Sequence, residues 1–272
     1  MRLAFFGDVV GKSGREAVKR HLPRIRADLK LDAVVINAEN AAGGFGITRS
    51  TADELYDAGA DVLTLGNHSF DNPQGISVIE NEDRLLRPCN YPPNTATGRG
   101  SGMYNVNGYQ LLVINVLGRV FMDALDDPFQ AVERELNTAP LGVAADAIIV
   151  DIHAEATSEK QAMGHFCDGR ASLVVGTHQH VPTADTRIFA SGTAYQTDAG
   201  MCGDYNSVIG MNKEEPLRRF TTRMRGGRFT PATGDGTLCG IYVETDNKTG
   251  LAIRAEPLRY GGMLSNSFPE LA

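Results

Sequence analysis

Metal-ligand side chains follow five apolar runs of the sequence. Each run is rich in β-branched or aromatic residues, as buried strands are, and ends in a carboxylate, an amide or an imidazole. The residues at these ends are Asp8, Glu39 with Asn40, Asn67 with His68, His153, and His178 with His180. Because ligands collect at the carboxyl ends of strands in an open α/β sheet, residues this far apart in sequence can meet in one crevice. Oxygen and nitrogen donors without thiolate suit a pair of iron, manganese or zinc ions.

Each of these residues also has an ordinary structural explanation. A single Asp or Asn after a strand commonly caps a turn or a helix through its own side chain. An isolated histidine is usually a packing residue. The coincidence on five runs favours metal binding, and so does the pair His178-x-His180, which can reach one site from a single loop.

The elements that must position these residues read as an α/β fold. Short apolar runs alternate with stretches of helical spacing in the first half of the chain. We predict strands over 2–7, 33–37 and 61–65, and helices over 15–29 and 51–58. Pro23 should kink or restart the first helix. Gly59 provides a plausible C-terminal cap for the second.

The second half of the chain predicts antiparallel as well as buried parallel strands. Asn107-Gly108 separates two alternating runs, which is a strong hairpin signal. Two buried strands are expected over 147–152 and 172–176 with a helix near 158–164 between them, and the tail over 238–258 reads as another hairpin. Without a long linker or a repeat, we expect one domain over residues 1–272, with a mixed sheet or two packed sheets.

Composition limits the class of protein. The 272 residues are 42% hydrophobic and carry 26 basic against 33 acidic side chains, a net charge of −7. That charge gives the molecule no global attraction for a long nucleic acid, and it fits a small substrate, such as a phosphate ester held locally by cations, better. We find no apolar stretch long enough for a membrane helix and no secretory cleavage site, and the four cysteines form no CxxC pair. We therefore expect a cytoplasmic protein with reduced thiols.

Together the motifs resemble the calcineurin-like metallophosphoesterase superfamily. Its modules correspond here to Gly7-Asp8, Glu39-Asn40, Gly66-Asn67-His68, His153 and Gly176-Thr177-His178-Gln179-His180. Two departures stand out: the usual GDxH becomes GDVV, and the usual bridging aspartate becomes Glu39. These departures, with NAENAAGGFGIT and VGTHQHVPTAD, resemble the bacterial YmdB-type branch along essentially the whole chain. The resemblance implies a four-layer α-β-β-α sandwich with mixed sheets.

The same resemblance implies two metal ions per chain. One ion would be held by Asp8, Glu39, Asn40 and His180, and the other by Glu39, Asn67, His153 and His178. Glu39 is then the bridging ligand, and Asn40 replaces the histidine that Val10 cannot supply. Iron is the metal expected first, with manganese or zinc as alternatives. A homo-oligomer stays open.

The implied activity is hydrolysis of 2′,3′-cyclic nucleotides. A hydroxide between the metals would attack phosphorus, and His68 would give a proton to the departing ribose oxygen. His68 could instead only orient its neighbour Asn67. An alternative from another class is a regulatory protein that binds metals and a cyclic nucleotide with little or no turnover.

Other interpretations of the motifs are weaker. Gly11-Lys12-Ser13 follows a strand, but the loop before it is one residue too short for a phosphate-binding GxxxxGK[ST] motif. No signature of a nucleophilic serine or cysteine is present. The loop around Phe45 should lie above the metals, and Phe45, Phe70 and Tyr205 could stack a nucleobase, although core packing is the better explanation.

Overall fold

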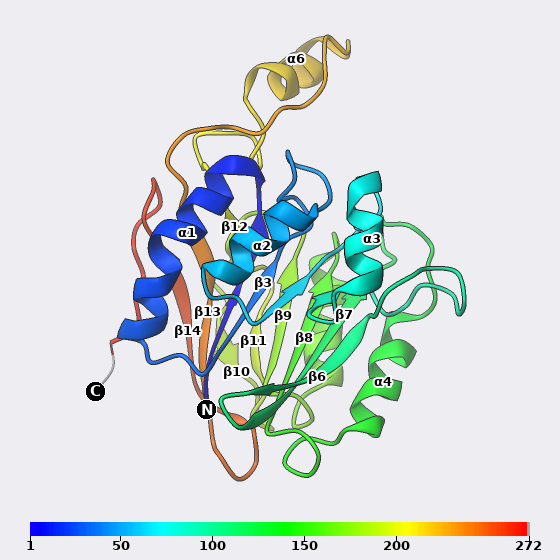
Figure 1. The fold of residues 1–272 in the computed structure, drawn as a ribbon, viewed down its shortest axis with the longest axis vertical. Coiled ribbons are helices and arrows are strands. Elements are labelled where there is room, and N and C mark those ends of the chain that lie inside the picture. The colour runs from blue at the N-terminus through cyan, green and yellow to red at the C-terminus, as the bar shows by residue number, and fades with distance from the viewer. Residues whose placement is uncertain (271–272) are drawn as a thin grey trace.

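Two six-stranded mixed sheets form the centre of the molecule (Figure 1). The structure is a computed structural model, and it describes residues 1–270. In the first sheet, the strand order is β14-β13-β1-β3-β4-β5, and β13 runs antiparallel to both of its neighbours. The strands are β1 (Arg2–Phe6), β3 (Ala33–Asn37), β4 (Val62–Thr64), β5 (Leu85–Leu86), β13 (Leu238–Thr245) and β14 (Ala252–Tyr260).

The second sheet has the order β10-β11-β9-β8-β7-β6. Its four central strands are parallel, and the edge strands β10 and β6 are antiparallel to their neighbours. The strands are β6 (Ser101–Val106), β7 (Tyr109–Leu117), β8 (Ala147–His153), β9 (Leu173–Thr177), β10 (Arg187–Ile188) and β11 (Ala194–Gln196). A further short pair, β2 (Asp8–Val9) with β12 (Met201–Cys202), continues from β1.

Helices cover the outer face of each sheet. The first sheet packs against α1 (Gly11–Asp28), α2 (Arg49–Asp57) and α3 (Pro73–Asn81), and the second against α4 (Pro128–Thr138) and α5 (Thr157–Phe166). The layers therefore run helix, sheet, sheet, helix, which confirms the predicted four-layer sandwich. A sixth helix, α6 (Glu214–Thr222), stands beyond the ends of the sheets (Figure 1). No helix within residues 1–270 is both long and apolar enough to span a bilayer.

Alternation along β1 shows why its run is apolar throughout. Leu3 and Phe5 point into the core between the sheets, whereas Ala4 and Phe6 point toward the helices. All four side chains are fully buried. A strand that is covered on both faces loses the polar half of the usual alternating pattern. This is the reason that the runs that end in the candidate donor residues are apolar throughout.

The structure corrects the predicted first helix. It begins at Gly11 instead of Arg15 and continues through Pro23 to Asp28, so the proline does not restart it. Pro23 lies on the exposed side of α1, and Lys19, whose carbonyl it leaves without an amide partner, is also an exposed residue. Helices α3, α4 and α6 were not predicted.

The predicted hairpins are confirmed. Asn107 and Gly108 connect β6 to β7 with φ angles of 50° and 87°, the left-handed pair that a tight two-residue turn requires. The tail forms the antiparallel pair β13 and β14.

The core between the sheets should dominate stability. Replacing Phe5 by Ala removes a fully buried ring from this core and should lower the free energy of unfolding by about 3–5 kcal/mol. Ile253→Ala, on β14 of the same sheet but 63% exposed, should change it by less than about 0.5 kcal/mol. Urea unfolding followed by circular dichroism measures both. Equal losses in the two variants would contradict this account of the core.

Candidate metal centre

The five ligand-bearing runs end at one place. Asp8 lies on β2, Glu39 and Asn40 follow β3, Asn67 and His68 follow β4, His153 ends β8, and His178 and His180 follow β9. Two groups of donor atoms form there, each within 4.8 Å: Glu39 with His153 and His178, and Asp8 with Glu39 and His180. Because Glu39 belongs to both groups, the two candidate ion positions are adjacent.

In the first group, three atoms that carry lone pairs surround Nε2 of His153. His153 Nε2 lies 2.9 Å from Asn67 Oδ1, 3.2 Å from Glu39 Oε1 and 3.2 Å from His178 Nδ1. A single proton on Nε2 can satisfy only one of these neighbours. A cation among the four atoms would satisfy all of them, and the oxygen and nitrogen donors fit a divalent transition metal.

The second group contains acceptors without partners. Asp8 Oδ1 lies 3.8 Å from His180 Nε2 and, within residues 1–270, has no hydrogen-bond donor. Asn40 Oδ1 is likewise buried and without a donor in the described chain, while its Nδ2 donates to the carbonyl of Gly44 at 2.9 Å. A buried acceptor without a partner destabilises the fold by about 1–3 kcal/mol. These residues therefore fit a bound cation, which would accept both lone pairs.

Among the donor side chains, charge is concentrated on Glu39 and His153. Burial alone would raise the pKa of Glu39, but the positive charge and the hydrogen bond of His153 lower it to about 2. Burial opposes charge on His153, but Glu39 raises the pKa of this imidazole to about 9. Burial also raises the pKa of Asp8 and lowers that of His178 to about 3. The two buried carboxylates thus depend on a nearby positive charge.

Gly66 is required by close packing beside Glu39. A β-carbon at this position would overlap the Glu39 carboxylate and the His153 ring. The glycine of the Gly-Asn-His module therefore makes room for the side chains of Glu39 and His153.

A hydrogen-bonded chain behind His153 fixes its ring. The Thr177 hydroxyl donates to Asp151 Oδ1 at 2.7 Å, so it must accept from His153 Nδ1, which lies 2.8 Å away. Nδ1 therefore carries a proton, and in the neutral ring that metal binding requires, the Nε2 lone pair faces the site. Asp151 is fully buried and also accepts from Thr64 and Asn37. The sequence gave no signal for Thr177.

The loop that carries His178 and His180 is strained and tied down. Both residues have left-handed backbones, with φ of 99° and 65°, which is costly for residues other than glycine. Asp198 holds the loop by accepting from the backbone N–H of Gln179 at 3.0 Å. It also forms a fully buried ion pair with Lys160 of α5 at 2.8 Å. Asp198 also closes a local turn, because its Oδ1 accepts from the backbone N–H of Gly200 at 2.8 Å, so it combines turn formation with this anchoring role.

The outer nitrogens of the two loop histidines also have partners. His178 Nε2 lies 3.2 Å from a carboxylate oxygen of Glu155, and His180 Nδ1 lies 2.8 Å from the carbonyl of Ile209. Each contact fixes which ring nitrogen is left to face the site. Sequence reasoning did not identify Glu155 or Ile209.

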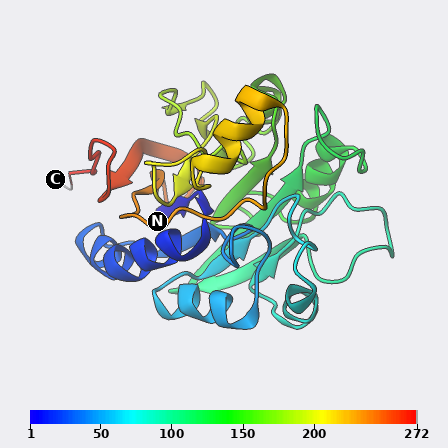
Figure 2. The ribbon, with the colours of Figure 1, turned by 90° about the horizontal axis from the view of Figure 1, so that it is seen from above.

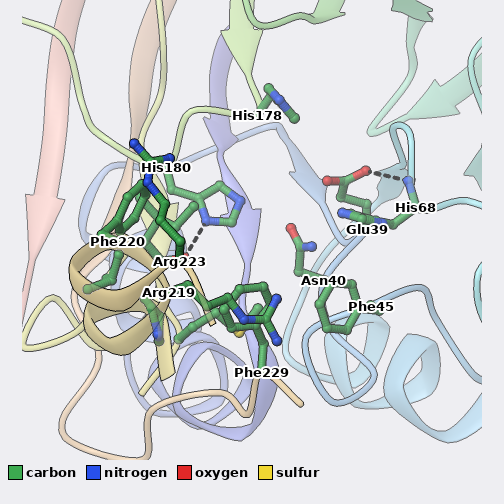
Figure 3. Close-up of a pocket in the computed structure, with 14 residues that line it drawn as sticks. Glu39, Asn40, Phe45, His68, His178, His180, Arg219, Phe220, Arg223 and Phe229 are labelled. Atoms are coloured by element: carbon green, nitrogen blue, oxygen red, sulfur yellow. Dashed lines mark hydrogen bonds between the residues drawn. The ribbon is translucent and has the colours of Figure 1, made fainter. Parts of the chain in front are cut away.

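His68 lies at the edge of the same cavity (Figure 3). Its backbone N–H donates to Glu39 Oε2 at 3.1 Å, and its Nδ1 is 2.6 Å from Asp71 Oδ2. Phe45 packs edge-on against the imidazole. Asp71 orients the ring from three residues away, a spacing that sequence reasoning did not use.

A cavity of about 480 Å³ opens above the donor groups, a size typical of small-molecule sites. Phe45 lines it, as do four residues of the α6 region that the sequence did not predict: Arg219, Phe220, Arg223 and Phe229. In contrast, Phe70 packs against the core, and the Tyr205 hydroxyl donates to the carbonyls of Met201 and His180.

The chain behind His153 yields a test by substitution. Thr177→Val keeps the side-chain shape but breaks the link from His153 Nδ1 to Asp151, so metal affinity should fall about 10- to 100-fold. Metal titration of the purified protein measures this change. Thr193→Val is the matched control, because this buried hydroxyl bonds the carbonyls of Cys167 and Ala171, away from the donor atoms. Equal losses of affinity in both variants would indicate general destabilisation and contradict the proposed role.

Comparison with known proteins gives one consistent answer. The family model described as YmdB-like protein matches residues 4–258. The 2′,3′-cyclic-nucleotide 2′-phosphodiesterase of Bacillus subtilis is 44% identical over 256 residues, which are 94% of this chain and 96% of that protein. Two crystal structures superpose with a TM-score of 0.89: a hypothetical protein from Thermus thermophilus, at 43% identity, and a novel phosphatase from Mycoplasma pneumoniae, at 34%. They cover 97% and 96% of this chain, and 100% and 93% of their own. The chain therefore belongs to the YmdB-like family, which is related to the metallophosphoesterases.

Proposed function

We propose that this chain is a two-metal phosphodiesterase that hydrolyses 2′,3′-cyclic nucleotides. The observation that carries the proposal is the pair of donor groups that share Glu39 at the floor of one cavity, with His68 beside them. The name of the Bacillus subtilis relative supports this choice of substrate.

The ligands would divide as the resemblance implies. Asp8, Glu39, Asn40 and His180 would hold one ion, and Glu39, Asn67, His153 and His178 the other. We propose iron, with manganese or zinc as alternatives, since the donors are carboxylate, amide and imidazole without thiolate. Two such ions supply a nucleophilic water at neutral pH and stabilise charge on the phosphoryl oxygens.

His68 would act on the leaving oxygen. Its Nδ1 contacts the carboxylate of Asp71, which orients the ring and leaves Nε2 as the atom that would give the proton. In the reaction, water adds to phosphorus, the bond from phosphorus to the ribose 2′-oxygen breaks, and that oxygen takes the proton from His68. The product is a nucleoside 3′-phosphate with a free 2′-hydroxyl.

The role of His68 is testable by turnover of 2′,3′-cyclic AMP, with 3′,5′-cyclic AMP and an aryl phosphodiester beside it. His68→Ala should lower kcat by about 10²- to 10⁴-fold without loss of metal, because the proton donor is removed and the proposed ligands stay. His165→Ala is the control, since this exposed imidazole stacks on Phe189 away from the cavity.

Three outcomes separate the hypotheses. Unchanged turnover in His68→Ala would remove this residue from the reaction. Wild-type protein that binds metal and nucleotide without turnover would contradict the enzyme and support the regulatory binding protein. Wild-type protein that binds no metal would contradict the ligand assignment.

A further inference from the structure

Basic residues are concentrated in one segment of this acidic protein. Residues 213–229, which we call the arginine arm, contain α6 and the loop after it. The arm has six basic and two acidic side chains and therefore a net charge of +4. The remaining residues carry a net charge of −11, which together with the arm gives the total of −7. Its five arginines are Arg218, Arg219, Arg223, Arg225 and Arg228. The net charge of the whole chain was the reason to expect no long nucleic acid as a partner. It does not reveal this one strongly basic surface.

Four of these guanidinium groups are free. Arg218, Arg223, Arg225 and Arg228 are exposed and form no ion pair with any carboxylate of residues 1–270. Only Arg219 is paired, with Glu215 at 2.7 Å, and it also stacks on the Phe229 ring at 3.9 Å. In contrast, all four arginines of α1 pair with carboxylates: Arg15 with Glu54, Arg20 with Asp235, Arg24 with Asp28, and Arg26 with Asp61. The arm is therefore the part of the surface that is ready for an external anion.

The arm lies directly over the metal centre. Figure 1 shows α6 beyond the ends of the sheets, and Figure 2 shows it over the middle of the molecule. Pro216, Arg219, Phe220 and Arg223 recur at helical spacing and line the cavity that also contains Glu39. In Figure 3, Phe220 and Arg223 lie across the cavity from Phe45. Phe220 is 76% exposed, so most of its ring is open to a ligand.

We propose that the preferred substrate is the 3′ end of a single-stranded RNA that carries a 2′,3′-cyclic phosphate. This inference rests on the proposed function. The cyclic phosphate would lie between Glu39 and His68, the terminal bases would stack on Phe220 and Phe45, and the upstream phosphates would follow the free arginines out of the cavity. Arginines interleaved with aromatic rings are the usual means of holding single strands without reading their sequence.

The number and position of the arginines favour a strand over a single nucleotide. A cyclic mononucleotide has one phosphate, which the metal centre would hold. Arg218, Arg225 and Arg228 do not line the cavity and would find no phosphate on such a ligand. A DNA strand lacks the 2′-oxygen from which the cyclic ester is built, so it cannot supply the reacting group.

A lipid surface fits the arm less well. A basic amphipathic helix can bind anionic membranes when its apolar face is turned outward. Here the face with Phe220 and Arg223 is turned toward the metal centre, although Leu217 and Met224 are exposed. The charge of the arm is continuous with the cavity, as an RNA end with its reactive phosphate requires.

The chemistry also defines what must precede this reaction. A 2′,3′-cyclic end forms when a ribose 2′-hydroxyl attacks the adjacent phosphodiester and displaces the 5′-oxygen of the next nucleotide. Hydrolysis adds water to that ester, breaks the bond to the 2′-oxygen, and leaves a 3′-phosphate with a free 2′-hydroxyl. The proposed substrate is therefore supplied by RNA cleavage of the transphosphorylating class.

The test compares kcat/KM for a hexameric RNA ending in a 2′,3′-cyclic phosphate with kcat/KM for 2′,3′-cyclic AMP. The wild type should prefer the RNA by about tenfold or more at low salt, and rising salt should reduce this preference, because several phosphates are neutralised. The variant R218Q/R225Q/R228Q should lose most of the preference. The charge-matched control R20Q/R24Q/R99Q changes three exposed arginines outside the arm and should keep it.

Binding supplies a second readout that does not need turnover. Fluorescence anisotropy of the same labelled RNA with metal-stripped protein should show an affinity that the arm variant weakens about tenfold or more and the control variant retains. Displacement of the RNA by anionic phosphatidylserine vesicles but not by unlabelled RNA would overturn the proposal in favour of a membrane. Turnover of 2′,3′-cyclic AMP with no preference for RNA would overturn it and leave the proposed function intact, whereas no turnover of either substrate identifies a failure of the proposed function itself.

Discussion

The burial of two carboxylates at one point is the constraint on which this structure depends. Asp8 and Glu39 are 0% and 1% exposed, and a buried anion destabilises a fold unless positive charge or hydrogen bonds compensate it. The parallel strands β1 and β3 bring them together, and the imidazoles of His153 and His180 approach from the second sheet. The site therefore forms where the carboxyl ends of the strands from the two sheets meet.

Around the two carboxylates, buried polar interactions fix the geometry of the donor side chains. Asp151 and Thr177 hold the His153 ring, and Asp198 with Lys160 holds the loop whose backbone is strained at His178 and His180. Each is a fully buried polar group that a purely structural core would fill with apolar side chains. A rigid donor set requires no rearrangement when a cation binds, which favours tight binding and a fixed position for substrate.

Sequence reasoning identified what depends on local pattern and missed what depends on packing between distant elements. The donors were predictable because each ends an apolar run and both sheets bury those runs on two faces. The hydrogen-bonded link from His153 through Thr177 to Asp151 was not predictable, because a threonine at the end of a strand such as β9 has no distinctive sequence pattern. Helix α6 was missed because Pro216 is its only buried residue, so it lacks the apolar stripe that reveals α1. The relation of its arginines to the donor groups becomes apparent only when the fold places them over Glu39.

The most direct test of the account is to count metal in variants of the shared ligand. Purified wild-type protein supplied with iron or manganese should contain about two ions per chain by mass spectrometry. Glu39→Ala should lose both, because both donor groups include this carboxylate, whereas Asn67→Ala should retain about one. Two ions retained in Glu39→Ala, with the fold intact by circular dichroism, would contradict the shared ligand and with it the proposed arrangement of the site.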